Sequence, residues 1–207
     1  MIQKETVETV LYLLFILTII NFSTYFTNWI GKNFYENELR VNTIFDLFHH
    51  YTPDLHKYEL FVNVIPFFLL ICLFLCGVGL DSIKEFAWKL LLIYILRSLT
   101  VITTILPKHE KCDYNVETFS LSTFIGGCYD KVFSGHMAFT FLGSLIYYRE
   151  KFISFSTFVG LNLLEASLII LTRSHYTIDV ILAVLITYLV YDGDYHIFSD
   201  FAKKLKV

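Results

Sequence analysis

Six apolar stretches with few charged residues constrain the fold of this chain more than any other feature. They cover residues 7–27, 59–80, 86–106, 134–148, 152–172 and 177–191. A helical run of about 20 apolar residues fits the roughly 30 Å hydrocarbon core of a bilayer. We therefore predict an all-α, polytopic membrane protein with about six transmembrane helices, forming a single membrane domain over residues 1–207.

The composition supports a membrane protein and argues against a nucleic-acid-binding one. Of the 207 residues, 56% are hydrophobic and 17% are charged, against roughly 25% charged in soluble domains. The net charge of −3 comes without a basic stripe. The first apolar run could also be a signal peptide, but residues 21–29 lack a small-residue cleavage site, so we favour a retained helix.

Two of the predicted helices are short, which indicates where their polar ends lie. Runs 134–148 and 177–191 can reach across a membrane only if their first residues sit at its boundary. Counting helices then brings loop 107–133 and the starts of both runs to one face, where they can meet. Each side of the membrane has seven basic residues, and only their density favours termini in the cytoplasm.

His175 and Asp179 are four residues apart at the start of the last run. On a helix this spacing places both side chains on one face, one turn apart. A carboxylate there orients the imidazole and stabilises it when it gains charge, as in catalytic triads. A capped helix start is the alternative, but an Asp within an apolar run favours a catalytic role.

Ser134, Gly135 and His136 open the fourth run. Ser is a good helix N-cap, Gly lets backbone N–H groups approach an anion closely, and helix N-termini favour phosphate. A His at such a site can protonate a leaving oxygen. We predict phosphate chemistry here, with an ordinary capped helix start and an interfacial His as the alternative.

Four more charged residues lie in or beside the apolar runs. Arg97 and Arg173 carry guanidinium groups, which bind phosphate bidentately, and we expect at least one of them to do so. An interfacial anchor is the alternative for Arg173. Lys89 is near a helix end, where a Lys can snorkel toward water. Glu165 is expected to pair inside the bundle rather than act in catalysis.

The segments around these residues resemble sphingomyelin synthases. The family's Cys-Gly-Asp-x-x-Phe/Tyr-Ser-Gly-His-Thr motif is similar to residues 128–136 here, which read Cys-Tyr-Asp-Lys-Val-Phe-Ser-Gly-His. Its His-Tyr-Thr-Val/Ile-Asp-Val motif matches residues 175–180, and its Arg-x-x-Thr…Leu-Pro segment resembles residues 97–107. The similarity covers residues 95–191, the expected catalytic core.

The resemblance implies a six-helix bundle of the wider lipid phosphate phosphatase (PAP2-like) superfamily, and a mechanism. His175, oriented by Asp179, would attack the phosphorus of a phospholipid such as phosphatidylcholine, while His136 protonates the departing diacylglycerol. Ceramide or another lipid alcohol would then accept the phosphocholine or phosphoethanolamine head group, with His136 as the base. No metal or other cofactor is needed, because Arg and helix-end N–H groups neutralise the phosphate. The implied phosphate-binding set is Arg97, Arg173, Ser134, Gly135 and Asp130.

Departures from the family pattern bear on the substrates. Tyr129 replaces the motif's Gly and Met137 replaces the Thr after Ser-Gly-His. Both are expected to flank the pocket, so they affect the head group and acceptor more than the chemistry. The phosphatase signature Lys-x6-Arg-Pro is absent, since Lys89 lies eight residues before Arg97 and Ser98 replaces Pro. This favours the transferase branch.

The resemblance also implies a location. The site would face the lumenal or exoplasmic side of a Golgi-like endomembrane or the plasma membrane. Cys112 and Cys128 would then lie in a compartment that permits a disulfide, with free thiols as the alternative. The expected partners are a phospholipid donor, the lipid-alcohol acceptor and the membrane, without nucleic acid; a homo-oligomer is compatible with the sequence.

Two other functions stay open. Water could be the acceptor, which would make the protein a lipid phosphatase or a phospholipase C-like hydrolase. The chain could instead be a catalytically silent lipid-binding or scaffold protein, but the presence of both His residues, the Asp and Arg97 argues against this.

Overall fold

The computed structural model describes residues 2–37, 44–107 and 127–192. Within these ranges every regular element is a helix, which confirms the predicted all-α fold. The elements are α1 (Ile2–Asn37), α2 (Leu47–Tyr51), the 3₁₀ helix η1 (His56–Asn63), α3 (Val64–Leu75), α4 (Leu80–Thr103), α5 (Gly135–Arg149), α6 (Phe155–Leu171) and α7 (Thr177–Asp192).

The break between α3 and α4 falls earlier than the apolar pattern suggests. α3 ends at Leu75, and Gly77 follows with a φ of 73°, a left-handed conformation that suits glycine. The polar residues 81–85, which we expected to connect two helices, belong to the first turns of α4. Their polarity marks the boundary of the apolar stretch, whereas α4 itself begins at Leu80.

Within the described ranges, three stretches are long and apolar enough to cross a membrane: Glu5–Asn33, His56–Leu75 and Leu80–Thr103. α6 is a shorter apolar helix. α5 and α7 have 15 and 16 residues, which at 1.5 Å per residue reach about 24 Å, short of the roughly 30 Å hydrocarbon core. The three long apolar helices indicate an integral membrane protein. That the chain crosses the membrane six times stays a prediction.

The outer surface of the bundle is apolar, and its interior combines an apolar core with buried polar groups. Large apolar side chains are exposed along the outer helices, including Phe15, Phe22, Phe67, Leu75, Leu163 and Leu185. The interior holds polar groups, among them Asn21, Thr27, Asn162, Glu165 and Thr187. A bilayer favours this arrangement, because lipid solvates apolar side chains and leaves polar groups to be satisfied inside.

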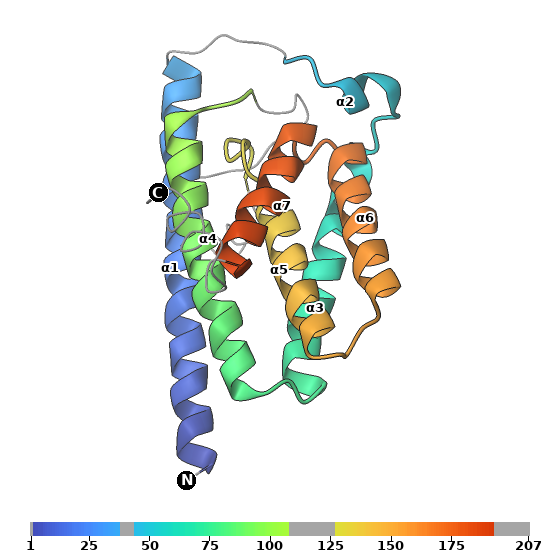
Figure 1. Ribbon diagram of the computed structural model, residues 1–207. Coiled ribbons are helices and arrows are strands. Elements are labelled where there is room, and N and C mark those ends of the chain that lie inside the picture. Colours follow the sequence, from blue (N-terminus) through green and yellow to red (C-terminus); the bar gives the residue numbers. More distant parts are fainter. Residues whose placement is uncertain (1, 38–43, 108–126, 193–207) are drawn as a thin grey trace, which may run out of the picture.

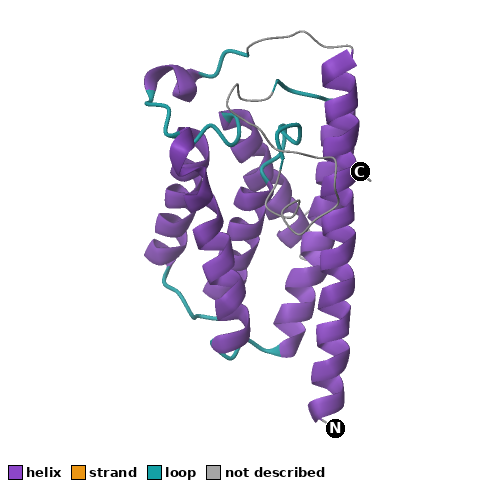
Figure 2. Cartoon of the chain, turned by 180° about the vertical axis from the view of Figure 1, so that it is seen from behind, coloured by secondary structure: helices purple, strands orange, loops and turns teal. Residues whose placement is uncertain are grey.

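α5 is the centre of the bundle. It contacts α3, α4, α6 and α7, while α1 packs along α4 at the periphery, as Figures 1 and 2 show from opposite sides. Most side chains of α5 are buried. One of them, Tyr147, donates a hydrogen bond to the Leu69 carbonyl of α3 at 2.9 Å. α5 and α7 run in the same direction (Figure 1), so their first residues lie at the same end of the bundle.

At the opposite end of the bundle, an ion-pair network joins α4, α5 and α7. Arg149 donates hydrogen bonds to both oxygens of Glu85 at 2.8 and 2.7 Å, and Lys89 pairs with the same carboxylate at 2.9 Å. Lys89 Nζ also donates to the Tyr191 carbonyl at 2.8 Å. The Lys89 side chain is buried. The expectation that it snorkels to water is therefore wrong, because internal acceptors satisfy its charge.

α1 packs closely against the loop that leads into α5. A Cβ atom at Gly31 would lie 2.7 Å from the Cβ of Tyr129, and one at Gly127 would overlap the side chain of Asn28. Asn28 Oδ1 accepts a hydrogen bond from the Tyr129 N–H at 3.2 Å. Glycine at both contact points lets the helix and the loop backbone approach, which fixes the loop over the bundle.

Gly31→Ala should lower the free energy of unfolding by about 1–3 kcal/mol, because the new methyl group has no room beside Tyr129. Gly160→Ala on α6 is the matched control, since no described atom lies within 4 Å of a Cβ there and alanine favours a helix. Thermal unfolding in detergent micelles measures both variants. A wild-type melting temperature for Gly31→Ala would contradict this packing.

Candidate active site

The structure brings His175 and Asp179 together at the start of α7, but His175 lies in the bend that precedes the helix, so the prediction that helical spacing joins the pair is wrong. His175 Nδ1 lies 3.3 Å from Asp179 Oδ2, and both side chains are buried. The same carboxylate oxygen accepts the Tyr176 N–H at 2.9 Å, as the acidic residue of a capping box does. Because an ionised carboxylate only accepts hydrogen bonds, Nδ1 of His175 carries the proton and Nε2 keeps its lone pair.

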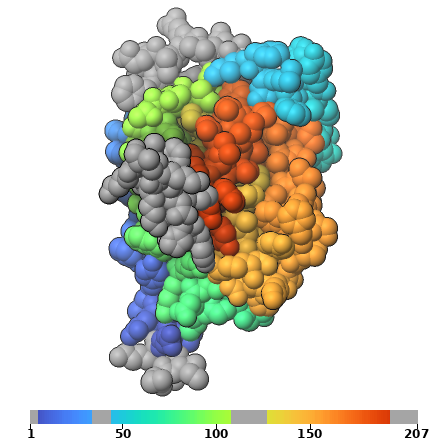
Figure 3. All heavy atoms as spheres, in the orientation of Figure 1, coloured from blue at the N-terminus to red at the C-terminus, as the bar shows by residue number. Residues whose placement is uncertain are grey.

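Asp46 ties the start of α7 to the short helix α2. Its Oδ2 accepts the Thr177 N–H at 2.7 Å, and its Oδ1 accepts the Thr177 hydroxyl at 2.8 Å. Oδ1 also accepts the His49 N–H at 3.0 Å, so one carboxylate caps two helices. Figure 3 shows α2 lying over the ends of α6 and α7.

The hydrogen bonds to Asp46 also set its charge. Partial burial raises the pKa of this carboxyl, but the hydrogen bonds from His49 and Thr177 outweigh burial and hold the net pKa below its ordinary value. Asp46 is therefore ionised at neutral pH, which is the form that caps a helix start best.

The start of α5 touches the start of α7. Ser134 Oγ accepts the Met137 N–H at 3.3 Å as a helix cap, and the Ser134 N–H donates to the Asp179 carbonyl at 3.3 Å. Gly135 has no room for a side chain, because a Cβ atom would lie 2.8 Å from the Tyr94 hydroxyl. The two motif segments are thus in direct contact through their backbones.

His136 lies in the first turn of α5 and contacts η1. Its Nε2 is 2.9 Å from Asn63 Oδ1. Because an amide oxygen only accepts, Nε2 carries the proton and Nδ1 is left for proton transfer. Among the described residues, the backbone N–H groups of Gly135 and His136 have no acceptor. They are therefore available to an anion at the helix start.

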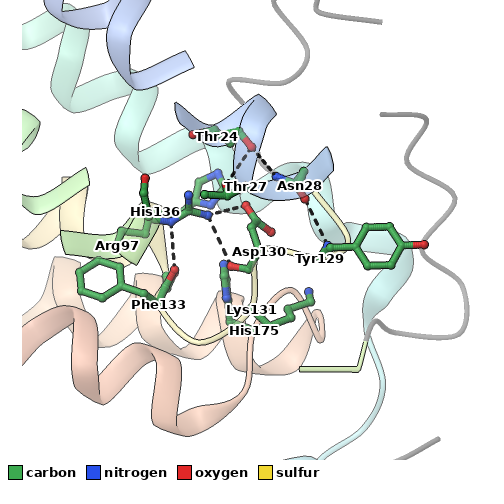
Figure 4. Close-up of polar contacts among 12 residues, drawn as sticks. Thr24, Thr27, Asn28, Arg97, Tyr129, Asp130, Lys131, Phe133, His136 and His175 are labelled. Atoms are coloured by element: carbon green, nitrogen blue, oxygen red, sulfur yellow. Dashed lines mark hydrogen bonds and ion pairs between the residues drawn. The ribbon is translucent and has the colours of Figure 1, made fainter. Parts of the chain in front are cut away.

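Arg97 reaches the same space from α4. Its Nη2 pairs with the Asp130 carboxylate and its Nε donates to the Phe133 carbonyl at 3.2 Å, as Figure 4 shows. Its Nη1 is buried and has no partner within the described part of the chain. Burial raises the pKa of Asp130, but Arg97, His175 and Lys131 together outweigh burial, and the net pKa lies below its ordinary value. Arg97 is thus held in place with one nitrogen free.

A small, partly open pocket lies beside His175. Its lining combines two imidazoles, two basic side chains, a tyrosine and a proline, namely His49, Pro107, Lys131, Arg173, His175 and Tyr176. Lys131 Nζ donates to the Ser174 carbonyl, and burial lowers the pKa of this amine below its ordinary value. No carboxylate belongs to the described lining, so the pocket favours an anionic group.

Arg173 occupies the connection between α6 and α7, where its φ of 61° is left-handed. Its guanidinium donates to the carbonyls of His49 and Thr52 at 2.8 and 2.6 Å, and to the Thr52 hydroxyl at 3.1 Å. These bonds fix α2 over the start of α7. Arg173 lines the pocket, but much of its hydrogen-bonding capacity already serves the fold.

Sequence reasoning missed four residues of this site: Asp46, His49, Asn63 and Lys131. The stretch 45–53, which contains Asp46 and His49, only faintly resembles a family motif. Lys131 lies inside a motif but at one of its variable positions. Asn63 has no sequence signal, because its role depends on η1 folding against α5.

Three other expectations need correction. Tyr129 and Met137 were expected to flank the pocket, but neither belongs to its lining. Tyr129 is buried and points away from Arg97 (Figure 4), and Met137 lies in the core. Glu165 was expected to pair within the bundle, yet both of its buried carboxylate oxygens lack a partner among the described residues.

Cys128 is buried and disulfide-bonded. Its predicted partner, Cys112, lies outside the described residues, whereas Cys72 and Cys76 are free thiols. Across residues 2–37, 44–107 and 127–192, no group of three or more His, Cys, Asp or Glu side chains could hold a metal ion.

The fold and the site together define a helical membrane protein with a histidine–carboxylate centre at the end of the bundle where unpartnered N–H donors of Arg97 and α5 also lie. A family model described as PAP2 superfamily C-terminal matches residues 127–197, which include both histidine motifs. This match supports a place in the PAP2-like phosphatase and phosphotransferase superfamily, and with it an enzyme that acts on phosphorus-containing lipid head groups. No curated protein matches the chain.

Asp46→Ala should lower the free energy of unfolding by about 1–2 kcal/mol, because α2 and α7 lose a shared cap. Asp81→Ala is the control, since Asp81 is an exposed acidic residue in the first turn of α4. Differential scanning calorimetry of both variants in micelles checks this expectation. If Asp46→Ala and Asp81→Ala have the same melting temperature, the Asp46 carboxylate does not tie α2 and α7 together.

Proposed function

We propose that this protein is a membrane phosphotransferase in which His175 carries the head group of a phospholipid from donor to acceptor. The observation that supports this most directly is the contact between two helix starts. It brings the His175–Asp179 pair of α7 beside the free N–H groups of α5 and the free Nη1 of Arg97. The superfamily match supports the same class of chemistry.

In the first half-reaction, Nε2 of His175 attacks the phosphorus of the donor. The bond from phosphorus to the diacylglycerol oxygen breaks and its electron pair leaves on that oxygen. His136, which has taken up a second proton on Nδ1 before the reaction, gives this proton to the leaving oxygen and keeps the Nε2 proton bonded to Asn63. Arg97 Nη1 and the N–H groups of Gly135 and His136 bind the phosphate oxygens as charge develops. Asp179 stabilises the imidazolium that forms on His175.

In the second half-reaction, an acceptor hydroxyl attacks the phosphorus and the bond to His175 Nε2 breaks. The motif resemblance favours ceramide as the acceptor, and phosphatidylcholine or phosphatidylethanolamine as the donor. Asp130 acts through Arg97, which it holds, and Ser134 through the start of α5, which it caps. Arg173 lines the pocket and holds α2.

We place the site on the lumenal or exoplasmic side of an endomembrane or the plasma membrane. The disulfide at Cys128 supports this side, because disulfides persist in oxidising compartments. The site lies at the end of the bundle that also carries this loop, next to the membrane surface where a phospholipid head group resides.

Hydrolysis is the second candidate function. Its supporting observation is the polar and basic lining of the pocket, which admits water as readily as a lipid hydroxyl. The first half-reaction would be identical. In the second, water instead of ceramide would attack the phosphorus and release the head group phosphate from His175.

Vesicles containing the protein, phosphatidylcholine or phosphatidylethanolamine, and fluorescent ceramide should yield a fluorescent phosphosphingolipid and diacylglycerol. The ceramide product distinguishes transfer from hydrolysis. If diacylglycerol appears without a ceramide product, water is the acceptor. If neither product appears with any phospholipid donor, the transferase and hydrolase readings both fail.

His175→Ala should reduce turnover to background, because the attacking nitrogen is lost. Asp179→Asn should lower turnover by about 10²-fold or more, since the imidazole loses the carboxylate that sets its tautomer. Ser167→Ala is a control, because Ser167 is a polar residue of α6 that bonds only its own helix. Diacylglycerol release measures all three, and full activity in His175→Ala would refute the nucleophile assignment.

A further inference from the structure

His49 lies beside the proposed nucleophile with one ring nitrogen uncommitted. Its Nε2 is 3.1 Å from the His175 carbonyl. Because a carbonyl only accepts, Nε2 carries the proton and Nδ1 has the lone pair of a base. The His49 ring also stacks on Tyr176, with the ring centroids 5.4 Å apart, and both side chains line the pocket.

The backbone of His49 is held from both sides. Asp46 accepts its N–H at 3.0 Å, and Arg173 donates to its carbonyl at 2.8 Å. Such support is typical of a side chain that must keep one orientation for catalysis. Burial lowers the pKa of His49, and Arg173 and Lys131 lower it further against the attraction of Asp46. The imidazole is therefore neutral at pH 7.

Two nearby histidines differ from His49 in ways that sharpen its role. His136 has Nε2 committed to Asn63 and does not line the pocket. His50, the next residue along α2, is exposed, and its ring contacts Phe45 and Tyr51. Of the three, His49 alone combines a free basic nitrogen with a place in the pocket wall within the described chain.

We propose that His49 is the general base of the second half-reaction, whereas His136 serves as the acid of the first. This inference rests on the proposed phosphotransferase function. Nδ1 of His49 takes the proton of the acceptor hydroxyl as the acceptor oxygen bonds to phosphorus. The bond from phosphorus to His175 Nε2 breaks, and its electron pair returns to that nitrogen. The His49 imidazolium then releases its proton to water, to which the half-buried ring has access, and His136 regains a proton from water before the next cycle.

The test separates the two half-reactions. The donor carries a radioactive phosphorus in its head group, so that label on the protein reports the first step and label on product reports the second. His49→Gln keeps an amide N–H that can donate to the His175 carbonyl but offers no basic nitrogen. His50→Gln is the matched control on the same helix.

His49→Gln should become labelled at nearly the wild-type rate and should accumulate label, because release slows by about 10²-fold. Imidazole added to His49→Ala should restore release by about 10-fold or more and should not accelerate the wild type or His50→Gln. His50→Gln should label and release as the wild type does.

Wild-type release from His49→Gln would overturn the base assignment and leave the phosphotransferase function standing. Loss of labelling in His49→Gln, without imidazole rescue of His49→Ala, would also overturn it and make His49 a positioning residue for His175. If the wild type itself never acquires label, the covalent mechanism fails, and the role of His49 fails with it.

Discussion

The site depends on the hydrogen bonds that the Asp46 carboxylate accepts from His49 and Thr177. This carboxylate caps α2 and α7 at once. The short helix α2, which follows α1 in the chain, therefore becomes part of the end of the bundle that carries the site. The start of α7 also contacts α5 directly, because the Ser134 N–H donates to the Asp179 carbonyl. The Asp46 cap and this backbone bond together hold the start of α7 between α2 and α5.

Partners inside the bundle hold several charged side chains of this membrane protein. Asp130 pairs with Arg97, Arg173 binds backbone carbonyls of α2, and Asp179 accepts hydrogen bonds from the start of its own helix. These three charges are held by fixed partners, as the low-dielectric interior requires, whereas both oxygens of Glu165 and Oδ1 of Asp179 have no partner among the described residues. Among the unpartnered groups of the site, Arg97 Nη1 and the first N–H groups of α5 are donors and can bind an anion.

The sequence predicted those parts of the fold and site that depend on local spacing. Ser134 caps its own helix as predicted. His175 and Asp179 do meet, but His175 precedes α7, so the turn before the helix brings them together and not the helical spacing that the sequence indicated. Asp46, His49 and Asn63 were missed because their roles exist only after distant segments pack. Lys89 and Glu165 were misjudged for a related reason: burial and partners in a bundle depend on helix rotation, which the apolar runs do not fix.

The central claim is that His175 becomes covalently attached to the head group of a phospholipid. Rapid quenching of the protein with a phospholipid donor, followed by mass spectrometric mapping of the modified residue, tests this most directly. The account predicts a phosphorus–nitrogen adduct on His175 with the mass of the head group phosphate, absent from His175→Ala. Turnover of the donor with no adduct on His175, or with an adduct on another residue, would contradict it.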